Sequence, residues 1–250
     1  MTRPVTIVGS YLSPYVRKVL AVLQRKGIAY EIDPITPFMG DERFSQLSPL
    51  RRIPVLLDGD LALVDSTVIC EYLEERTPEP ALYPRGLAAR ARARWLEEYA
   101  DSRMGDVFIW QYWYPLVVNR FVFGAKPDPA AIEKTVAVEI PEVLGYLERE
   151  LPERGFLFGA EPTVPDLTIA AVYRNLELGR HRLDETRWPK TAAFLARAAA
   201  LDELARLRPF EEAMLRAPPT QHRKVLAELG APLTRESYDT GVPRPGIMRL

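Results

Sequence analysis

The stretch from Gly9 to Lys18 constrains the fold most, because a short apolar run precedes it and a helical pattern follows it. The β-branched run at 5–8 is typical of a buried strand. Beyond the turn, apolar residues recur at helical spacing as far as Gly27. Ser13 followed by Pro14 is a favourable helix start, since the serine hydroxyl accepts a free amide. The sequence predicts a strand, a turn and a helix whose N-terminus attracts an anion.

The next fifty residues contain further predicted strands and helices. Residues 29–32 predict a second strand, which pairs in parallel with the first because a helix connects them. A proline-bearing, irregular stretch with one short helix at 42–47 follows. Two apolar runs around Asp58-Gly59-Asp60 predict a hairpin. Asp65-Ser66 then opens a helix to Arg76, with Val68 on its apolar face.

Beyond this module the convincing patterns are helical. We place the domains at 1–77 and 87–215, with a proline-rich linker at 78–86 and a proline-rich extension at 216–250. Helices are expected in the ranges 87–119, 130–151, 190–200, 202–215 and 221–229. Thr163-Val164-Pro165-Asp166 predicts a capping box before a buried helix. The expected fold class is therefore α/β followed by all-α.

Composition excludes several classes of function. The net charge of -1 gives no electrostatic basis for binding nucleic acid. The single Cys70 fits a reducing compartment, and no run of apolar residues is long enough for a membrane span, so we expect a soluble cytoplasmic protein. His181 and His222, with one cysteine, make a metal site of soft ligands improbable. No glycine-rich phosphate loop is present in the sequence.

Four local motifs carry a resemblance to a known family. They are Ser13-Pro14-Tyr15-Val16-Arg17, Arg52-Ile53-Pro54-Val55, Asp65-Ser66 and Thr163-Val164-Pro165-Asp166. With the order of the elements, they resemble the cytosolic glutathione transferases over about residues 4–215, and the serine-type first motif is most similar to bacterial theta-like or beta-like members. The resemblance implies a thioredoxin-like N-terminal domain, an all-helical C-terminal domain, a homodimer, and glutathione as co-substrate.

The resemblance also implies a glutathione site. The family's proline after Ile53 is cis and turns backbone groups toward the cysteinyl part of glutathione, whereas a trans Pro54 would simply start a strand. Asp65 and Ser66 are expected to hold the γ-glutamyl group, although the family usually has Glu or Gln at the first position, and Asp-Ser is also a common helix cap. Arg52 is expected at the glycine carboxylate, against the alternative of a solvated charge. A further family contact near Phe38 and Met39 is missing or remodelled.

Ser13 is the expected catalytic residue. A free thiol is only about 3% ionised at pH 7, and lowering its pKa by two units takes about 2.7 kcal/mol. A hydrogen bond to a charged sulfur supplies about 1.5 to 3 kcal/mol, and a helix N-terminus about 0.3 to 1. Tyr11 and Ser10 are the rival hydroxyl donors, and a purely capping Ser13 is the structural alternative. A serine here also disfavours thiol–disulfide exchange, and Cys70 is expected to be a buried core thiol.

The resemblance gives a less specific indication of the acceptor site, which binds the second, electrophilic substrate. Phe108, Tyr112 and Trp113 lie where the family binds a hydrophobic electrophile, and the alternative is that they form core or dimer contacts. The expected reaction is attack of the glutathione thiolate on that electrophile, with hydroperoxide reduction as a variant. Two alternatives remain open: a non-catalytic interaction protein of the same fold, and a specialised dehalogenase or ether lyase. The extension 216–250 is expected to be mainly irregular, and three alternatives are open for it: it covers the acceptor site, braces the dimer or is disordered.

Overall fold

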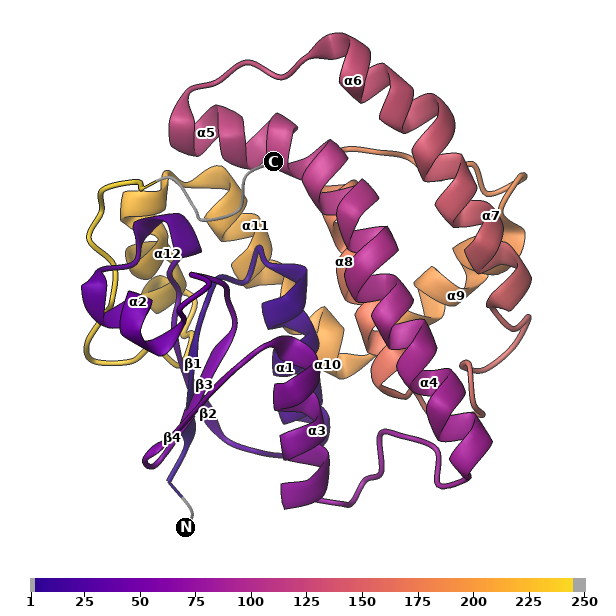
Figure 1. Cartoon of the computed structure of the whole chain (residues 1–250), viewed down its shortest axis with the longest axis horizontal. Coiled ribbons are helices and arrows are strands. Elements are labelled where there is room, and N and C mark those ends of the chain that lie inside the picture. Colours follow the sequence, from indigo (N-terminus) through magenta and orange to yellow (C-terminus); the bar gives the residue numbers. More distant parts are fainter. Residues whose placement is uncertain (1–2, 245–250) are drawn as a thin grey trace. The chain divides into compact units, whose positions relative to one another are not determined.

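A computed structural model describes residues 3–244, which divide into two compact units (Figure 1). The sheet unit combines the chain up to Pro80 with the chain from Arg206 onward, and the helical unit spans Ala81–Ala205. Residues 245–250 of the predicted extension lie outside the described residues. The chain therefore returns to the sheet after the helical unit is complete.

The sheet unit begins with the predicted order of strands and helices, shifted by a residue at some ends. Its elements are β1 (Val5–Val8), α1 (Pro14–Arg25), β2 (Tyr30–Asp33), the 3-10 turn η1 (Pro37–Met39), α2 (Glu42–Leu47), β3 (Val55–Asp58), β4 (Leu61–Val64), α3 (Ser66–Arg76), α11 (Arg208–Arg216), the 3-10 turn η4 (Pro219–Gln221) and α12 (His222–Glu228).

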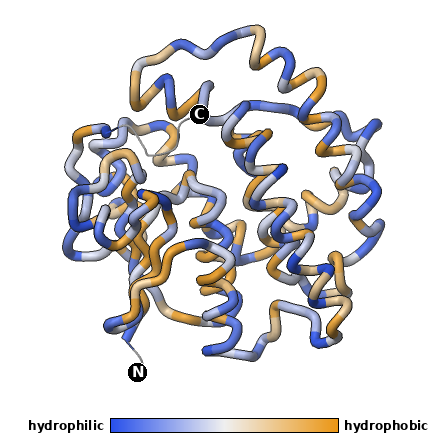
Figure 2. The backbone as a smooth tube through the Cα atoms, in the orientation of Figure 1, coloured by the Kyte–Doolittle hydropathy of each residue, from blue (hydrophilic) through white to orange (hydrophobic). Residues whose placement is uncertain are grey.

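The sheet has the strand order β2-β1-β3-β4. β1 pairs in parallel with β2, as the intervening helix predicts, and antiparallel with β3. β1, β3 and β4 consist mainly of apolar residues, which Figure 2 colours as hydrophobic, and α1 and α3 lie on one side of the sheet in Figure 1. At one end of the sheet, Val8 is aligned with Asp33 and Val55, and Val55 with Val64. The segments that continue from these four residues therefore start side by side.

Two contacts join the returning helix α11 to the beginning of the chain. The Tyr11 ring packs on Phe210 with ring centroids 4.9 Å apart. The buried Arg17 guanidinium lies 3.7 Å from the Glu211 carboxylate, and it also donates a hydrogen bond to the Tyr11 carbonyl. A buried charge needs such a partner to offset its desolvation. The pair therefore anchors α11 against α1.

The helical unit starts with one long helix whose middle part has wider, π-type turns. Its elements are α4 (Leu87–Tyr99), η2 (Ala100–Val118, π-type), α5 (Asn119–Phe123), α6 (Pro129–Lys134), η3 (Thr135–Glu139, π-type), α7 (Ile140–Glu150), α8 (Val164–Leu178), α9 (Pro189–Ala199) and α10 (Asp202–Ala205). The buried helix α8 packs against η2 and α4 to make the core of this unit.

The structure corrects two local predictions. The single helix expected over 202–215 is two helices, α10 and α11, because Pro209 stands in the first turn of α11 and has no amide to continue the preceding helix. Val68 does not join the apolar face of α3, since 47% of it is exposed, whereas its neighbours Ile69 and Cys70 are fully buried.

No helix within residues 3–244 combines the length with the apolar character that crossing a bilayer requires.

Candidate functional site

Ser13 caps the N-terminus of α1, as its sequence position predicts. Its backbone is extended, and its hydroxyl oxygen accepts a hydrogen bond from the Val16 amide at 3.4 Å. Pro14 occupies the first turn, where no amide is needed. The side chain of Ser13 is half-buried. Because the oxygen accepts the helix amide, the hydroxyl proton stays available to a second partner.

The two rival hydroxyls of the same turn are placed differently. Ser10 is buried, and its oxygen accepts a hydrogen bond from the Leu12 amide at 3.2 Å, which shapes the turn. Tyr11 is fully buried against Phe210, and burial, with Tyr30 as a secondary cause, raises the pKa of its phenol. Ser13 is therefore the most accessible of the three hydroxyls.

The Ile53–Pro54 peptide is cis, which confirms the prediction for this bond. It lies directly against the Ser13 turn. A Cβ added at Gly9 would stand 2.5 Å from Val16 Cγ2 and 3.3 Å from Ile53 Cβ. Only a glycine allows this close approach, so Gly9 packs the start of α1 against the segment that leads into β3.

Asp65 and Ser66 open α3 at the same end of the sheet. Asp65 has a φ of 79°, and its Oδ1 accepts the amides of Thr67 at 2.9 Å and Val68 at 3.2 Å. The Asp65 side chain is exposed, whereas Ser66 is buried. The buried Lys18 donates from Nζ to Thr67 Oγ1 at 2.9 Å and so joins α1 to the first turn of α3. Sequence reasoning missed Lys18, because only the packing of α1 on α3 reveals its partner.

Adjacent arginines, Arg51 and Arg52, have opposite surroundings. Arg52 is exposed, and its backbone is fixed by Ser48, whose Oγ accepts the Arg52 amide and donates to its carbonyl, both at 2.9 Å. Arg51, to which no role was assigned from the sequence, donates to the carbonyls of Pro37 at 3.1 Å and Gly40 at 2.9 Å. Arg51 thus holds the preceding loop, and Arg52 is the residue that faces solvent.

The predicted aromatic residues of the acceptor site lie in the core of the helical unit. Phe108 is fully buried edge-on to Tyr173, with centroids 6.1 Å apart. Tyr112 is 7% exposed and donates to the Gly179 carbonyl at 3.0 Å, and Trp113 is 3% exposed. These contacts favour the alternative that the sequence left open, a structural role.

The capping box before α8 is present, as predicted. Asp166 is fully buried, and its carboxylate accepts from the Thr163 amide at 2.8 Å, the Thr163 hydroxyl at 2.6 Å and the Leu157 amide at 2.9 Å. Burial raises the pKa of this carboxyl, while the hydrogen bonds oppose that rise. Cys70 is also fully buried, which confirms its predicted place in the core.

The register of the sheet brings most of the predicted site together. The Ser13 turn follows β1, Ile53–Pro54 precedes β3, and Asp65-Ser66 follows β4, all at one end of three adjacent strands. Strands in a sheet lie about 4.8 Å apart, so the three motifs are within the reach of one small peptide. The aromatic residues of η2 belong to the other unit.

Family models match both units. The model of the glutathione S-transferase N-terminal domain matches residues 7–81, and that of the C-terminal domain matches residues 117–207. A stringent starvation protein A homolog from Pasteurella multocida is 35% identical over 66% of this chain and 72% of its own. Glutathione S-transferase 3 of Zea mays is 32% identical over 67% of this chain and 76% of its own.

A solved structure shares the fold along nearly its whole length. It is a glutathione S-transferase from Rhodospirillum rubrum, which superposes with a TM-score of 0.78 at 26% identity, over 88% of this chain and 99% of that one. The domain models, the relatives and the motifs gathered at one end of the sheet agree. The chain belongs to the glutathione S-transferase family.

Proposed function

We propose that the chain is a glutathione transferase in which the Ser13 hydroxyl stabilises the glutathione thiolate. The observation that carries the proposal is the half-buried Ser13 at the start of α1, whose oxygen accepts the Val16 amide and whose proton remains to be donated. A hydrogen bond to a charged sulfur contributes about 1.5 to 3 kcal/mol, and the helix N-terminus about 0.3 to 1. Together these cover the roughly 2.7 kcal/mol that a drop of two units in thiol pKa requires.

In this proposal the tripeptide lies along the end of the sheet. The Ile53 backbone beside cis Pro54 binds the cysteinyl part, and the exposed Arg52 pairs with the glycine carboxylate. Ser66 and the first turn of α3 bind the γ-glutamyl carboxylate. Asp65 uses Oδ1 to cap α3, so its second oxygen is the one that receives the γ-glutamyl ammonium.

The reaction is nucleophilic attack by the glutathione sulfur on a hydrophobic electrophile, by substitution or addition. We assign electrophile binding to the helical unit, where Trp110 and Tyr114 are half-buried, in contrast to the buried Phe108, Tyr112 and Trp113. We also propose that the protein works as a cytoplasmic homodimer. Reduction of organic hydroperoxides by the same thiolate is a variant of this chemistry.

A titration followed by a turnover assay tests the proposal. Glutathione is titrated calorimetrically into the protein and into Ser13→Ala, and conjugation to an activated chloronitroarene is then measured. We expect similar affinities and a turnover at least about tenfold lower in the variant, the equivalent of one lost charge-assisted hydrogen bond. Ser102→Ala, which removes an exposed serine of η2, is the matched control and should change neither quantity. An unchanged turnover in Ser13→Ala would contradict the role of Ser13.

A second candidate is a binding protein of the same fold that performs no transfer. The similarity to a stringent starvation protein A homolog favours it, as does the loop at 37–41, whose backbone groups are occupied by the protein's own C-terminal residues. This candidate predicts no conjugation with any electrophile, even at saturating glutathione. Measurable turnover that depends on Ser13 would exclude it.

A further inference from the structure

The carboxylate of Asp33 is buried at the end of β2, with 1% of the residue exposed. Three donors surround it: Arg223 Nη1 at 2.9 Å, Ser237 Oγ at 2.7 Å and the Tyr238 amide at 2.7 Å. All three belong to residues 222–244, here called the C-terminal segment. Burial raises the pKa of Asp33 and these donors oppose the rise. An unpaired charge at this depth would be costly, so Asp33 and the C-terminal segment depend on each other.

The C-terminal segment also covers the open edge of the sheet. Ile32 donates its amide to the Pro232 carbonyl at 2.7 Å and accepts the Thr234 amide at 3.0 Å. β2 is an edge strand, whose unpaired backbone groups would otherwise face water. The C-terminal segment therefore pairs with the sheet edge through one bridge, between Ile32 and Leu233, next to Asp33.

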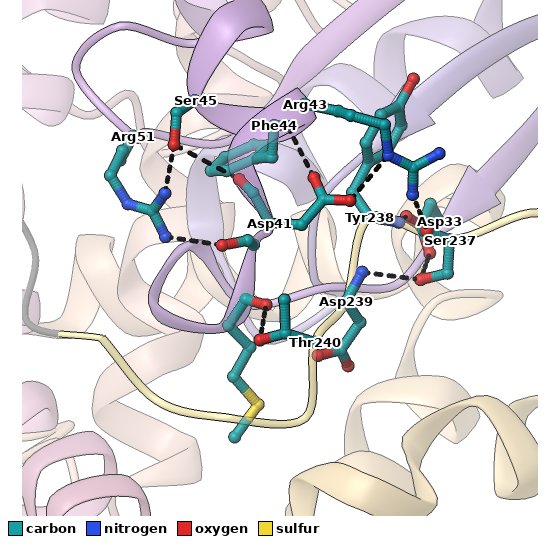
Figure 3. A network of polar contacts seen from close by, with 12 residues as sticks. Asp33, Asp41, Arg43, Phe44, Ser45, Arg51, Ser237, Tyr238, Asp239 and Thr240 are labelled. Atoms are coloured by element: carbon teal, nitrogen blue, oxygen red, sulfur yellow. Dashed lines mark hydrogen bonds and ion pairs between the residues drawn. The ribbon is translucent and has the colours of Figure 1, made fainter.

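From Asp33 the C-terminal segment runs along the loop at 38–41 and pairs with its backbone (Figure 3). The Thr240 amide and hydroxyl both donate to the Met39 carbonyl, at 2.9 and 3.0 Å. The Asp41 amide donates to the Tyr238 carbonyl at 2.7 Å. These contacts fix the loop where the family's upstream glutathione contact was expected and where the sequence offers Phe38 and Met39 instead.

The same loop holds Arg51, as Figure 3 also shows. Arg51 Nη2 donates to the Gly40 carbonyl at 2.9 Å, and Arg51 has a φ of 50°, a conformation that a non-glycine residue keeps only when its surroundings enforce it. Arg52, Ile53 and Pro54 follow directly in the chain. A continuous series of contacts thus leads from Asp33 through the C-terminal segment and the loop to the residues proposed to bind glutathione.

We infer that Asp33 is a positioning residue for the glutathione site: it binds the C-terminal segment, which in turn fixes the 38–41 loop and, through Arg51, supports the backbone of Arg52 and Ile53 that Ser48 also holds. This inference rests on the proposed function. The C-terminal family model ends at residue 207, so the C-terminal segment lies outside both matched domains, whereas Asp33 and the 38–41 loop lie within the N-terminal one. Asp33 also has a direct link to the site: its carbonyl accepts the Gly9 amide at 2.9 Å, at the start of the Ser13 turn.

The test compares two carboxylates of the sheet unit. Asp33→Asn removes the charge at Asp33, and Asp58→Asn is the matched control. Asp58 binds Arg76 at 2.7 Å and the Tyr72 hydroxyl at 2.7 Å, but it lies at the hairpin of β3 and β4. Hydrogen exchange of the ligand-free proteins is measured over residues 37–53, and glutathione KM and kcat are then determined separately.

For Asp33→Asn we expect faster exchange over 37–53 and a glutathione KM raised about tenfold, as for one lost charge-assisted bond, with kcat changed by less than about twofold. Asp58→Asn should leave exchange and KM unchanged. Ser237→Ala is a milder variant that keeps Arg223 and the Tyr238 amide. It should change the exchange over 37–53 and the glutathione KM in the same direction by less, and it replaces Asp33→Asn in the test if that variant does not fold.

A second pair of variants tests Arg223. Arg223→Met removes the charge and should raise the exchange over 37–53 and the KM, whereas Arg223→Lys keeps the charge and should stay close to the unaltered protein in both.

Two results would overturn the inference. One is unchanged exchange over 37–53 in both Asp33→Asn and Ser237→Ala. The other is faster exchange without any change in glutathione KM. If the unaltered protein binds no glutathione, the proposed function fails together with the role of Asp33 at the site. That result is distinct from failure of the inference alone, in which the unaltered protein and the variant bind glutathione equally well.

Discussion

The helices α1 and α8 both begin with a side-chain cap, but the two caps differ in burial and in the number of hydrogen bonds they make. At α1, Ser13 is half-buried and accepts one amide at 3.4 Å. At α8, Thr163 and Asp166 are buried, and Asp166 accepts three hydrogen bonds of 2.6 to 2.9 Å. A cap with every group paired and no access to solvent stabilises the fold, whereas one with a spare, accessible hydroxyl is open to a ligand. The residue types of the two motifs do not predict which cap is accessible to solvent.

The largest expected effect is at α8. Asp166→Ala leaves two amides and the Thr163 hydroxyl without their buried acceptor, so we expect a loss of about 3 kcal/mol in the free energy of unfolding. Denaturant unfolding followed by fluorescence measures it. Ser13→Ala should cost no more than about 1 kcal/mol, as for an ordinary cap. Equal losses at the two sites would contradict the distinction between a buried structural cap at α8 and an accessible cap at α1.

A third helix start, at α3, separates capping from binding. Asp65→Ala removes the cap and keeps a non-glycine side chain at a φ of 79°, so we expect a loss of about 1 to 2 kcal/mol in the free energy of unfolding. Asp65→Gly tolerates this φ and should cost only a few tenths of a kcal/mol. Both variants should weaken glutathione binding about tenfold by calorimetry. If Asp65→Gly bound glutathione as tightly as the unaltered protein, Asp65 would be a cap alone.

The smallest expected effect is a pH dependence at α12. His222 is buried, its Nε2 donates to the carbonyls of Met214 at 3.0 Å and Ala217 at 3.2 Å, and burial lowers its pKa. A histidine with a lowered pKa contributes stability above its unfolded value of about 6.5 and loses it as the pH falls below that value.

Thermal unfolding between pH 8 and pH 5 checks this pH dependence. As the pH is lowered past about 6.5, the midpoint temperature of unfolding should decrease slightly. In His222→Gln this part of the curve of midpoint against pH should be flatter. A curve for His222→Gln that is parallel to that of the unaltered protein over this range would rule out His222 as the titrating group.

Local signals predicted the elements and their order well, because strands, caps and turns depend on neighbours in sequence. The capping box at Thr163 and the cis bond at Pro54 are examples. The sequence could not predict what depends on distant partners. The Asp33–Arg223 pair spans 190 residues, and the choice between Arg51 and Arg52 as the accessible arginine depends on the carbonyls that surround Arg51. The helix break before α11 was predictable from Pro209 and was missed.

The pKa of bound glutathione reports directly on whether Ser13 stabilises the thiolate. Thiolate absorbance is followed against pH in the complexes of the unaltered protein, Ser13→Ala and Ser13→Thr. In the unaltered protein we expect a pKa about two units below that of the free thiol. The pKa should be at least about one unit higher in Ser13→Ala and largely restored in Ser13→Thr. An identical pKa in the unaltered protein and Ser13→Ala would show that Ser13 does not stabilise the thiolate.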